Sequence, residues 1–240
     1  MKNGKFAIII TTILLFVFAF CYSNFINVNK ERDSVKFKKE YEALNGVVVD
    51  DYYKYQKLDI DSNNPIKYSN YDEIFDVIDN KSGIIYLGFP ECPWCRTILP
   101  VLFKTANDYK IDTIYYLNIL NERDSYEVSD GKLVYSKDSN GKEKKGTKNY
   151  FKLLKKLDKF LEDYTVSDKS GKEYEVGEKR LYAPTVVFVK DGEILGIHVS
   201  SVDSQKSGFD KLTKDQKDEL YSIYESYIIK LKNLVCNEKC

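Results

Sequence analysis

The most regular hydrophobic pattern lies in the middle of the chain. Residues 84–89 form a nearly continuous apolar run, which is typical of a strand covered on both faces of its sheet. Helically spaced apolar positions follow over residues 92–107, and a second apolar run occupies residues 113–119. The order strand, helix, strand predicts a βαβ unit with a right-handed crossover.

The region before this unit is less regular. Apolar residues share one helical face over residues 34–44, and residues 47–61 suggest a poorly defined strand. A short strand is predicted at residues 66–68. A helix follows through residue 79, with Asn70 as its N-cap.

The pattern becomes sharp again near the C-terminus. Residues 185–189 predict a strand, Asp191-Gly192 a hairpin turn, and residues 194–199 the returning strand. A final helix is predicted from Thr213, as its N-cap, to about residue 234.

Residues 121–180 are more polar and are interpreted as an insertion between these two halves. Within it, residues 132–135 resemble a strand, and residues 148–164 carry a helical apolar face capped by Thr147. The insertion therefore combines hairpin and helical elements.

The overall charge excludes one class of function. The 240-residue chain has 37 Lys and Arg against 37 Asp and Glu, mixed along the sequence as on a solvated surface. No basic stripe interleaved with aromatic residues is present, so no nucleic-acid partner is expected.

The N-terminus carries a membrane signal. Lys2 and Lys5 precede an uncharged apolar segment over residues 6–22, between the lengths typical of a signal-peptide core and of a membrane span. The positive flank favours a cytoplasmic N-terminus and export of the rest. We therefore expect a membrane-anchored protein on the extracytoplasmic side.

The mode of anchoring stays open at this stage. Cys21 is a candidate for lipid attachment after signal cleavage, but the bulky Phe20 before it departs from bacterial lipoprotein signals. An uncleaved anchor and, less readily, simple secretion are the alternatives. All three export the remainder of the chain.

The chain is accordingly divided into four parts. Residues 1–29 form the signal or membrane anchor, and residues 30–65 a linker helix with an N-terminal extension. Residues 66–235 form the main domain, and residues 236–240 a cysteine-containing tail.

The strongest chemical signal is the tetrapeptide Cys92-Pro93-Trp94-Cys95, at the predicted junction of strand and helix. A helix N-terminus presents free N–H groups and a partial positive charge, which favour a thiolate over a thiol. The thiolate is the reactive form of cysteine, so this placement suits reversible disulfide chemistry.

These features together resemble the thioredoxin superfamily. Besides the dicysteine, Pro100 stands where members often have a helix-kinking proline, and Ala183-Pro184 precedes a strand and tight hairpin as their cis-proline does. The resemblance covers residues 66–120 and 181–234. It implies an α/β thioredoxin-like fold with a central mixed sheet flanked by helices. The whole chain looks most like membrane-anchored bacterial thioredoxin-like proteins, some labelled bacteriocin-transport accessory proteins.

The resemblance also implies roles for single residues. Cys92 would attack as a thiolate, and Cys95 would resolve the mixed disulfide. A cis Pro184 would pack against the dicysteine, and the Ala183 backbone would pair with a bound substrate strand. Trp94 would be either a substrate platform or a shield. We expect a thiol–disulfide oxidoreductase acting on protein thiols or disulfides as a monomer, without a cofactor.

Three residues bear on how far this chemistry extends. Many thioredoxins have a buried aspartate as proton acceptor six residues before the first cysteine, where this chain has Tyr86. Glu91 adjoins Cys92 but would raise its pKa, so it is interpreted as a solvated surface residue. His198, the only histidine, is assigned a structural role.

Other interpretations of the cysteines remain open. The domain could be an accessory or binding module whose Cys92–Cys95 disulfide is permanent. Cys236 and Cys240 could form a local disulfide staple, a second redox pair or free thiols, or join the dicysteine in a four-cysteine zinc site. No metal is expected on balance. Direction, whether oxidase, reductase or isomerase, is not fixed by the sequence.

Overall fold

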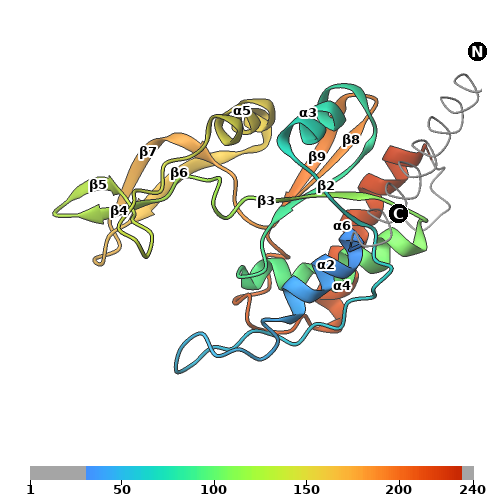
Figure 1. Ribbon diagram of the computed structural model, residues 1–240, viewed down its shortest axis with the longest axis horizontal. Coiled ribbons are helices and arrows are strands. Elements are labelled where there is room, and N and C mark those ends of the chain that lie inside the picture. Colours follow the sequence, from blue (N-terminus) through green and yellow to red (C-terminus); the bar gives the residue numbers. More distant parts are fainter. Residues whose placement is uncertain (1–30, 234–240) are drawn as a thin grey trace, which may run out of the picture.

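A mixed five-stranded sheet forms the centre of the molecule (Figure 1). The computed structural model describes residues 31–233. The sheet has the order β1-β3-β2-β8-β9, with β1, β3 and β2 parallel and β8 and β9 antiparallel to their neighbours. Its strands are β1 (Ile66–Tyr68), β2 (Gly83–Gly88), β3 (Ile114–Asn118), β8 (Thr185–Lys190) and β9 (Glu193–Val199).

Helices cover both faces of this sheet. The helices are α2 (Asp33–Glu42), α3 (Tyr71–Asn80), α4 (Pro93–Asp108) and α6 (Lys214–Lys232). Figure 1 shows α2, α4 and α6 together on one side and α3 on the other. The predicted α/β class, with a helix-flanked mixed sheet, is confirmed.

Local signals begin two of these helices where they were expected. The Asn70 side chain accepts a hydrogen bond from the Glu73 backbone N–H at 3.0 Å, which caps α3. Thr213 and Gln216 form a reciprocal capping box at the start of α6. Each side chain satisfies a backbone donor that the first helical turn leaves free.

The central strand β2 points its C-terminal end at the dicysteine. Its residues from Ile84 to Gly88 are buried, as the continuous apolar run predicts. Tyr86 lies between Tyr116 of β3 and Val186 of β8 in the register. The chain leaves β2 at Gly88 and enters α4 a few residues later, which places the cysteines at the strand's end.

The β8–β9 hairpin turns at Asp191-Gly192, as predicted. Both residues have positive φ, 51° and 78°. A β-carbon at Gly192 would lie 2.5 Å from the carbonyl oxygen of Asp79, so this turn accepts only glycine at that position.

The insertion forms two small sheets that extend away from the main sheet (Figure 1). Its elements are β4 (Tyr126–Ser129), β5 (Lys132–Tyr135), α5 (Lys148–Leu157), a 3-10 turn η1 (Asp158–Phe160), β6 (Glu162–Ser167) and β7 (Glu173–Arg180). The helix predicted over residues 148–164 is too long, since it ends at Leu157. Leu161 and Tyr164 are buried and have a helical spacing, but Leu161 precedes β6 and Tyr164 lies within it. The sequence did not predict β7, the strand with which β6 pairs.

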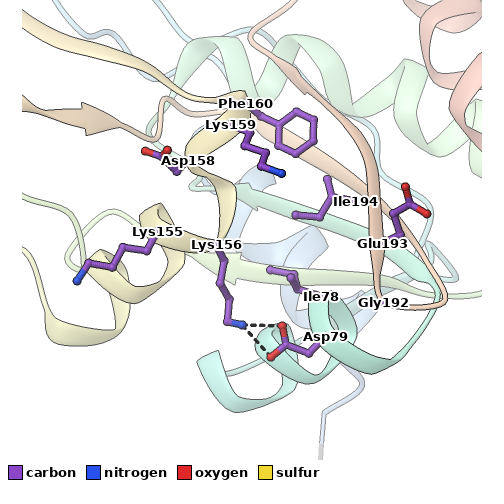
Figure 2. Close-up of a pocket in the computed structure, with 10 residues that line it drawn as sticks. All are labelled: Ile78, Asp79, Lys155, Lys156, Asp158, Lys159, Phe160, Gly192, Glu193 and Ile194. Carbon is purple, nitrogen blue, oxygen red and sulfur yellow. Dashed lines mark hydrogen bonds and ion pairs between the residues drawn. The ribbon is translucent and has the colours of Figure 1, made fainter.

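Helix α5 fastens the insertion to the domain through α3. Figure 2 shows Lys156 donating to both carboxylate oxygens of Asp79, at 2.6 and 2.8 Å. A cleft of about 610 Å³ lies beside this pair, bordered by Gly192 of the β8–β9 turn. Because Gly83 at the start of β2 pairs with Val189, this cleft lies at the end of the sheet opposite the dicysteine.

The N-terminal extension is part of the core. Phe37 and Tyr41 of α2 are fully buried. Residues 47–61 contain no regular strand, contrary to the prediction, but only an isolated bridge between Val48 and Lys54. The backbone groups of Leu58 and Ile60 bond instead to the side chains of Lys38, Glu42 and Asn45, so they are not free to pair with a neighbouring strand.

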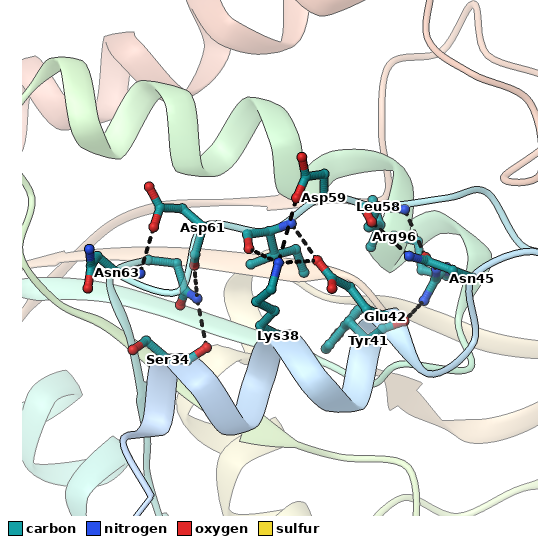
Figure 3. Close-up of polar contacts among 12 residues, drawn as sticks. Ser34, Lys38, Tyr41, Glu42, Asn45, Leu58, Asp59, Asp61, Asn63 and Arg96 are labelled. Carbon is teal, nitrogen blue, oxygen red and sulfur yellow. Dashed lines mark hydrogen bonds and ion pairs between the residues drawn. The ribbon is translucent and has the colours of Figure 1, made fainter.

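Polar contacts hold α2 and the returning chain together (Figure 3). Lys38 of α2 donates to Glu42 at 2.8 Å and to the Ile60 carbonyl at 2.6 Å. Asn45 exchanges two hydrogen bonds with the Leu58 backbone, at 2.7 and 2.8 Å. These bonds hold the two ends of residues 31–65 together, and Arg96 of α4 joins them to the domain by donating to the Tyr41 carbonyl at 2.5 Å and to Asn45 at 2.7 Å.

The ends of the chain lie outside this description. The anchor segment with Cys21 and the tail with Cys236 and Cys240 fall in residues 1–30 and 234–240. Within residues 31–233, no helix is both long enough and apolar enough to cross a membrane.

Candidate functional site

Cys92 occupies the N-cap of α4. Its sulfur accepts the backbone N–H of Cys95 at 3.3 Å, and Pro93 is the first helical residue, where no N–H is needed. Both Cys92 and Cys95 are free thiols. The sequence therefore places the first cysteine directly at the positive end of the helix.

The surroundings of Cys92 favour its thiolate. A hydrogen bond from the Cys95 side chain lowers the pKa of the Cys92 thiol, with help from the backbone N–H groups of Cys95 and Trp94 and the charge of Arg123. Burial opposes this shift, since Cys92 is only 7% exposed. The donors outweigh it, so Cys92 is the more acidic of the two thiols.

Cys95 has the opposite character. Its side chain is fully buried, and burial together with the neighbouring Cys92 sulfur raises the pKa of Cys95 well above its ordinary value. The nearby Tyr86 hydroxyl acts on this pKa in the other direction. The pair thus divides into an acidic thiol near the surface and a protonated thiol behind it.

The loop before β8 meets Cys92 on its outer side. The Ala183–Pro184 peptide bond is cis. The Cys92 thiol donates to the Ala183 carbonyl oxygen at 3.2 Å, joining segments 91 positions apart in the sequence. The structure therefore brings together Cys92, Ala183 and Pro184, as the sequence predicted.

Trp94 is half-buried against a loop that sequence analysis did not single out. A β-carbon at Gly208 would lie 2.8 Å from the Trp94 backbone nitrogen and 3.0 Å from its ring. The Gly208 carbonyl accepts hydrogen bonds from Thr97 at 2.8 Å and Gln56 at 3.1 Å. The structure thus places Trp94 against the Gly208 loop, beside the dicysteine.

The inner side of Cys95 is lined by tyrosines. The hydroxyls of Tyr86 and Tyr41 lie 2.8 Å apart, and both side chains are fully buried. A β-carbon at Gly88 would fall 2.7 Å from the Tyr86 hydroxyl and 2.8 Å from the Cys95 sulfur. Gly88 therefore leaves the space in which these two polar atoms approach each other.

Arg123 is a site residue that the sequence did not reveal. Its guanidinium lies 4.7 Å from the centre of the Phe89 ring, beside the dicysteine. Next to it, Asp124 forms a buried ion pair with Arg180 of β7 at 2.8 Å. The ion pair joins the start of the insertion to its last strand and so helps to fix the loop that carries Arg123. Nothing in the local sequence signals this long-range pairing.

Tyr41 was also missed, although a signal was present. Its helical face with Phe37 indicated burial, but the pattern does not identify the partner against which that face packs.

Two residues lie apart from the chemistry. His198 packs edge to face on Tyr224 with ring centres 5.5 Å apart, and burial lowers its pKa. Glu91 is exposed, and its backbone carbonyl accepts the Tyr55 hydroxyl at 2.8 Å. The structural and surface roles assigned to them agree with these positions.

In the part of the chain that the structure describes, no three His, Cys, Asp or Glu side chains are grouped to hold a metal ion. The zinc hypothesis needs Cys236 and Cys240, so it stays an untested alternative.

Comparison with known proteins adds no identity. No protein-family model matches the chain, and no curated protein matches it either. The function must therefore be argued from the site itself.

Proposed function

We propose that this chain is a thioredoxin-like thiol–disulfide oxidoreductase that exchanges disulfides with protein substrates. The observation that carries the proposal is the division of the dicysteine: an acidic Cys92 at a helix N-terminus beside a cis-proline, backed by a buried Cys95 whose pKa is raised. Such a division is what sequential nucleophile and resolving thiols require.

In the reducing direction the Cys92 thiolate attacks one sulfur of a substrate disulfide. A Cys92–substrate disulfide forms, and the other substrate sulfur leaves as a thiolate and takes up a proton. Cys95 then loses its proton and attacks the Cys92 sulfur, releasing the second substrate thiol. The enzyme ends with a Cys92–Cys95 disulfide, and the substrate has gained two electrons and two protons.

The Ala183–Pro184 loop is proposed to receive the substrate chain. Its carbonyl already touches the Cys92 thiol. Ala183 is half-exposed, so its backbone is accessible beside the nucleophile. An extended peptide pairing with this backbone would bring its cysteine to Cys92. We retain a monomer, without a cofactor, as part of the proposal.

Location follows from the N-terminal segment. Residues 6–22 are proposed to anchor the protein, with Cys21 as a possible lipid site, so that the redox domain faces the extracytoplasmic side.

The accessory-module alternative has one observation in its favour. Cys92 and Cys95 are 7% and 0% exposed, which is the burial expected of a permanent disulfide. A lowered Cys92 pKa argues against it, because a structural cystine has no use for a stabilised thiolate.

The deciding experiment compares two serine variants of the full-length protein in an insulin-disulfide reduction assay. Cys92→Ser should abolish turnover. Cys95→Ser should keep the first attack and accumulate a mixed disulfide, seen as a mass increase that dithiothreitol removes. Full turnover by Cys92→Ser would refute the proposal. Absent turnover by the native protein, with an unusually low potential, would support the accessory module.

The same preparation fixes the direction. A reduction potential of about −270 mV for the Cys92–Cys95 pair indicates a reductase, and one of about −120 mV indicates an oxidase.

A further inference from the structure

Two tyrosine hydroxyls on the buried side of Cys95, those of Tyr86 and Tyr41, are hydrogen-bonded to each other. The Tyr86 hydroxyl of β2 and the Cys95 sulfur lie 2.7 and 2.8 Å from the β-carbon position of Gly88, and the Tyr41 hydroxyl of α2 lies 2.8 Å from the Tyr86 oxygen. All three side chains are fully buried. Water is therefore excluded from the inner face of the sulfur that must become a thiolate.

The two tyrosine hydroxyls have a preferred donor-to-acceptor order once Cys95 is a thiolate. Burial raises the pKa of Tyr86 well above its ordinary value, so its hydroxyl keeps its proton and acts as a donor. If Tyr86 donates to the sulfur, its oxygen is free to accept the proton of Tyr41. Hydrogen bonds arranged head to tail in this way polarise and strengthen one another.

The carboxylates nearest this side act on the neighbours of Cys95, Glu42 on Arg96 and Glu40 and Glu91 on Tyr116. Each element packed against Cys95 contributes a titratable or charged group. These groups are Cys92 at the N-cap of α4, Arg96 of α4, Tyr86 of β2, Tyr116 of β3, Tyr41 of α2, Tyr224 of α6 and Arg123. Among the tyrosines, the hydroxyls of Tyr116 and Tyr224 have no hydrogen-bond partner. Tyr86 is the hydroxyl that the structure places beside the sulfur.

Tyr41 is held firmly enough to orient its neighbour. Its ring stacks on Phe37 at 4.3 Å between centres. Its backbone carbonyl accepts a guanidinium N–H of Arg96 at 2.5 Å, and Arg96 directly follows Cys95 in α4 (Figure 3). The helix that carries Tyr41 and the helix that carries the thiol are thus fastened to each other.

We propose that Tyr86 is a catalytic residue that donates a hydrogen bond to the Cys95 thiolate as it attacks Cys92, and that Tyr41 is the positioning residue that orients the Tyr86 hydroxyl. The inference rests on the proposed thiol–disulfide exchange and assigns the resolving half of that reaction to residues on β2 and α2.

The step balances without a further reactant. Cys95 gives its proton to solvent or to the departing substrate thiolate, and its sulfur forms the bond to Cys92 as the Cys92–substrate bond breaks. Tyr86 keeps its proton throughout, so it stabilises charge and is neither oxidised nor consumed.

The test follows the two halves of the reaction separately. In the full-length protein with Cys21, Cys236 and Cys240 changed to serine, Ellman's reagent should react at Cys92 and release one nitrothiobenzoate. The attack of Cys95 should then release a second. In Tyr86→Phe the first release should be unchanged. The second should slow roughly tenfold, with the midpoint of its pH profile moved upward.

Two further variants keep the result interpretable. Tyr41→Phe should slow the second release by about two- to threefold, because it removes the orienting bond and leaves Tyr86 in place. Tyr224→Phe removes a buried hydroxyl without a partner and should change neither release. Thermal melting checks that each variant is folded, and Tyr41→Phe carries the test if Tyr86→Phe does not fold.

A second release in Tyr86→Phe and Tyr41→Phe with the native rate and pH profile would overturn the inference while leaving the proposed function intact. Absence of the first, fast release at Cys92 in the native background would overturn the proposed function itself.

Discussion

The outer and inner sides of the dicysteine are contacted by different kinds of chemical group. The outer side, at Cys92, is contacted mainly by backbone groups, the N–H donors of the first α4 turn and the carbonyl of Ala183, with the Arg123 charge as a further contribution. The inner side, at Cys95, uses the side chains of Tyr86 and Tyr41, which are fully buried. Backbone donors exist wherever a helix begins, whereas the inner contacts depend on particular residues. The outer side should therefore tolerate substitution better than the inner side.

Removing the guanidinium of Arg96, the residue after Cys95, should have the largest effect on stability. Arg96 is 1% exposed and donates to the Tyr41 carbonyl, to Asn45 at 2.7 Å and to the Gln56 carbonyl at 2.7 Å. Arg96→Met keeps the apolar stem but leaves these acceptors unpaired. It should lower the free energy of unfolding by about 3 kcal/mol, measured by urea denaturation.

Lys38→Met is the matched control, because Lys38 belongs to the same network but its side chain is 30% exposed. A loss below about 1 kcal/mol is expected. Equal losses of free energy for the two variants would contradict the view that burial makes the Arg96 hydrogen bonds the more stabilising ones.

Filling the space at Gly88 should disturb the inner side with a smaller cost. In Gly88→Ala the new methyl group would meet the Tyr86 hydroxyl and the Cys95 sulfur below 3 Å, at 2.7 and 2.8 Å. We expect a loss of about 2 kcal/mol in the free energy of unfolding and a slower attack by Cys95, since the two polar atoms must move apart.

Gly83→Ala, at the other end of β2, provides the comparison. Its β-carbon would meet the ring of Tyr115, which is only half-buried and can turn away. Its loss should be smaller, and its Cys95 kinetics should equal those of the native protein. A Gly88→Ala protein with native kinetics would show that the Tyr86–Cys95 approach is not needed.

Changing the charge on the outer side should have the smallest effect. The Arg123 charge is one of several factors that lower the pKa of Cys92, and it is outweighed by the hydrogen bond from Cys95. Below the Cys92 pKa the thiolate fraction rises with pH. Arg123→Gln raises that pKa, so at neutral pH it should reduce the rate of Cys92 alkylation by iodoacetamide about twofold. At a pH well above the pKa the two rates should converge.

Arg123→Lys keeps the charge and should recover most of the native rate. A rate reduced equally in both variants at every pH would assign Arg123 a packing role instead.

Much of the fold could be predicted because its signals are local. β1 was placed at residues 66–68 and β5 at 132–135, and Asn70 caps α3 as expected. Failures occurred where a distant partner decides the structure. Residues 162–167 become a strand because β7 pairs with them, and no property of Leu161 or Tyr164 alone separates that outcome from a longer helix.

The site divides in the same way. Cys92, Cys95 and the Ala183–Pro184 loop could be named from motifs with a fixed spacing. Tyr86 drew notice only as a departure from the superfamily pattern. Its partner Tyr41 lies 45 positions away, on a helix whose docking depends on Arg96, so sequence periodicity alone could not join them.

The position of α2 bears on where the domain can be cut. A recombinant fragment beginning at Ile66, the domain boundary drawn from the sequence, would lack the Phe37 and Tyr41 rings that fill the core against Tyr86 and Tyr116. Losing even one such buried aromatic commonly costs about 3–5 kcal/mol. The smallest fragment expected to fold therefore begins near residue 31. A graft of the dicysteine into another protein has to include α2 as well.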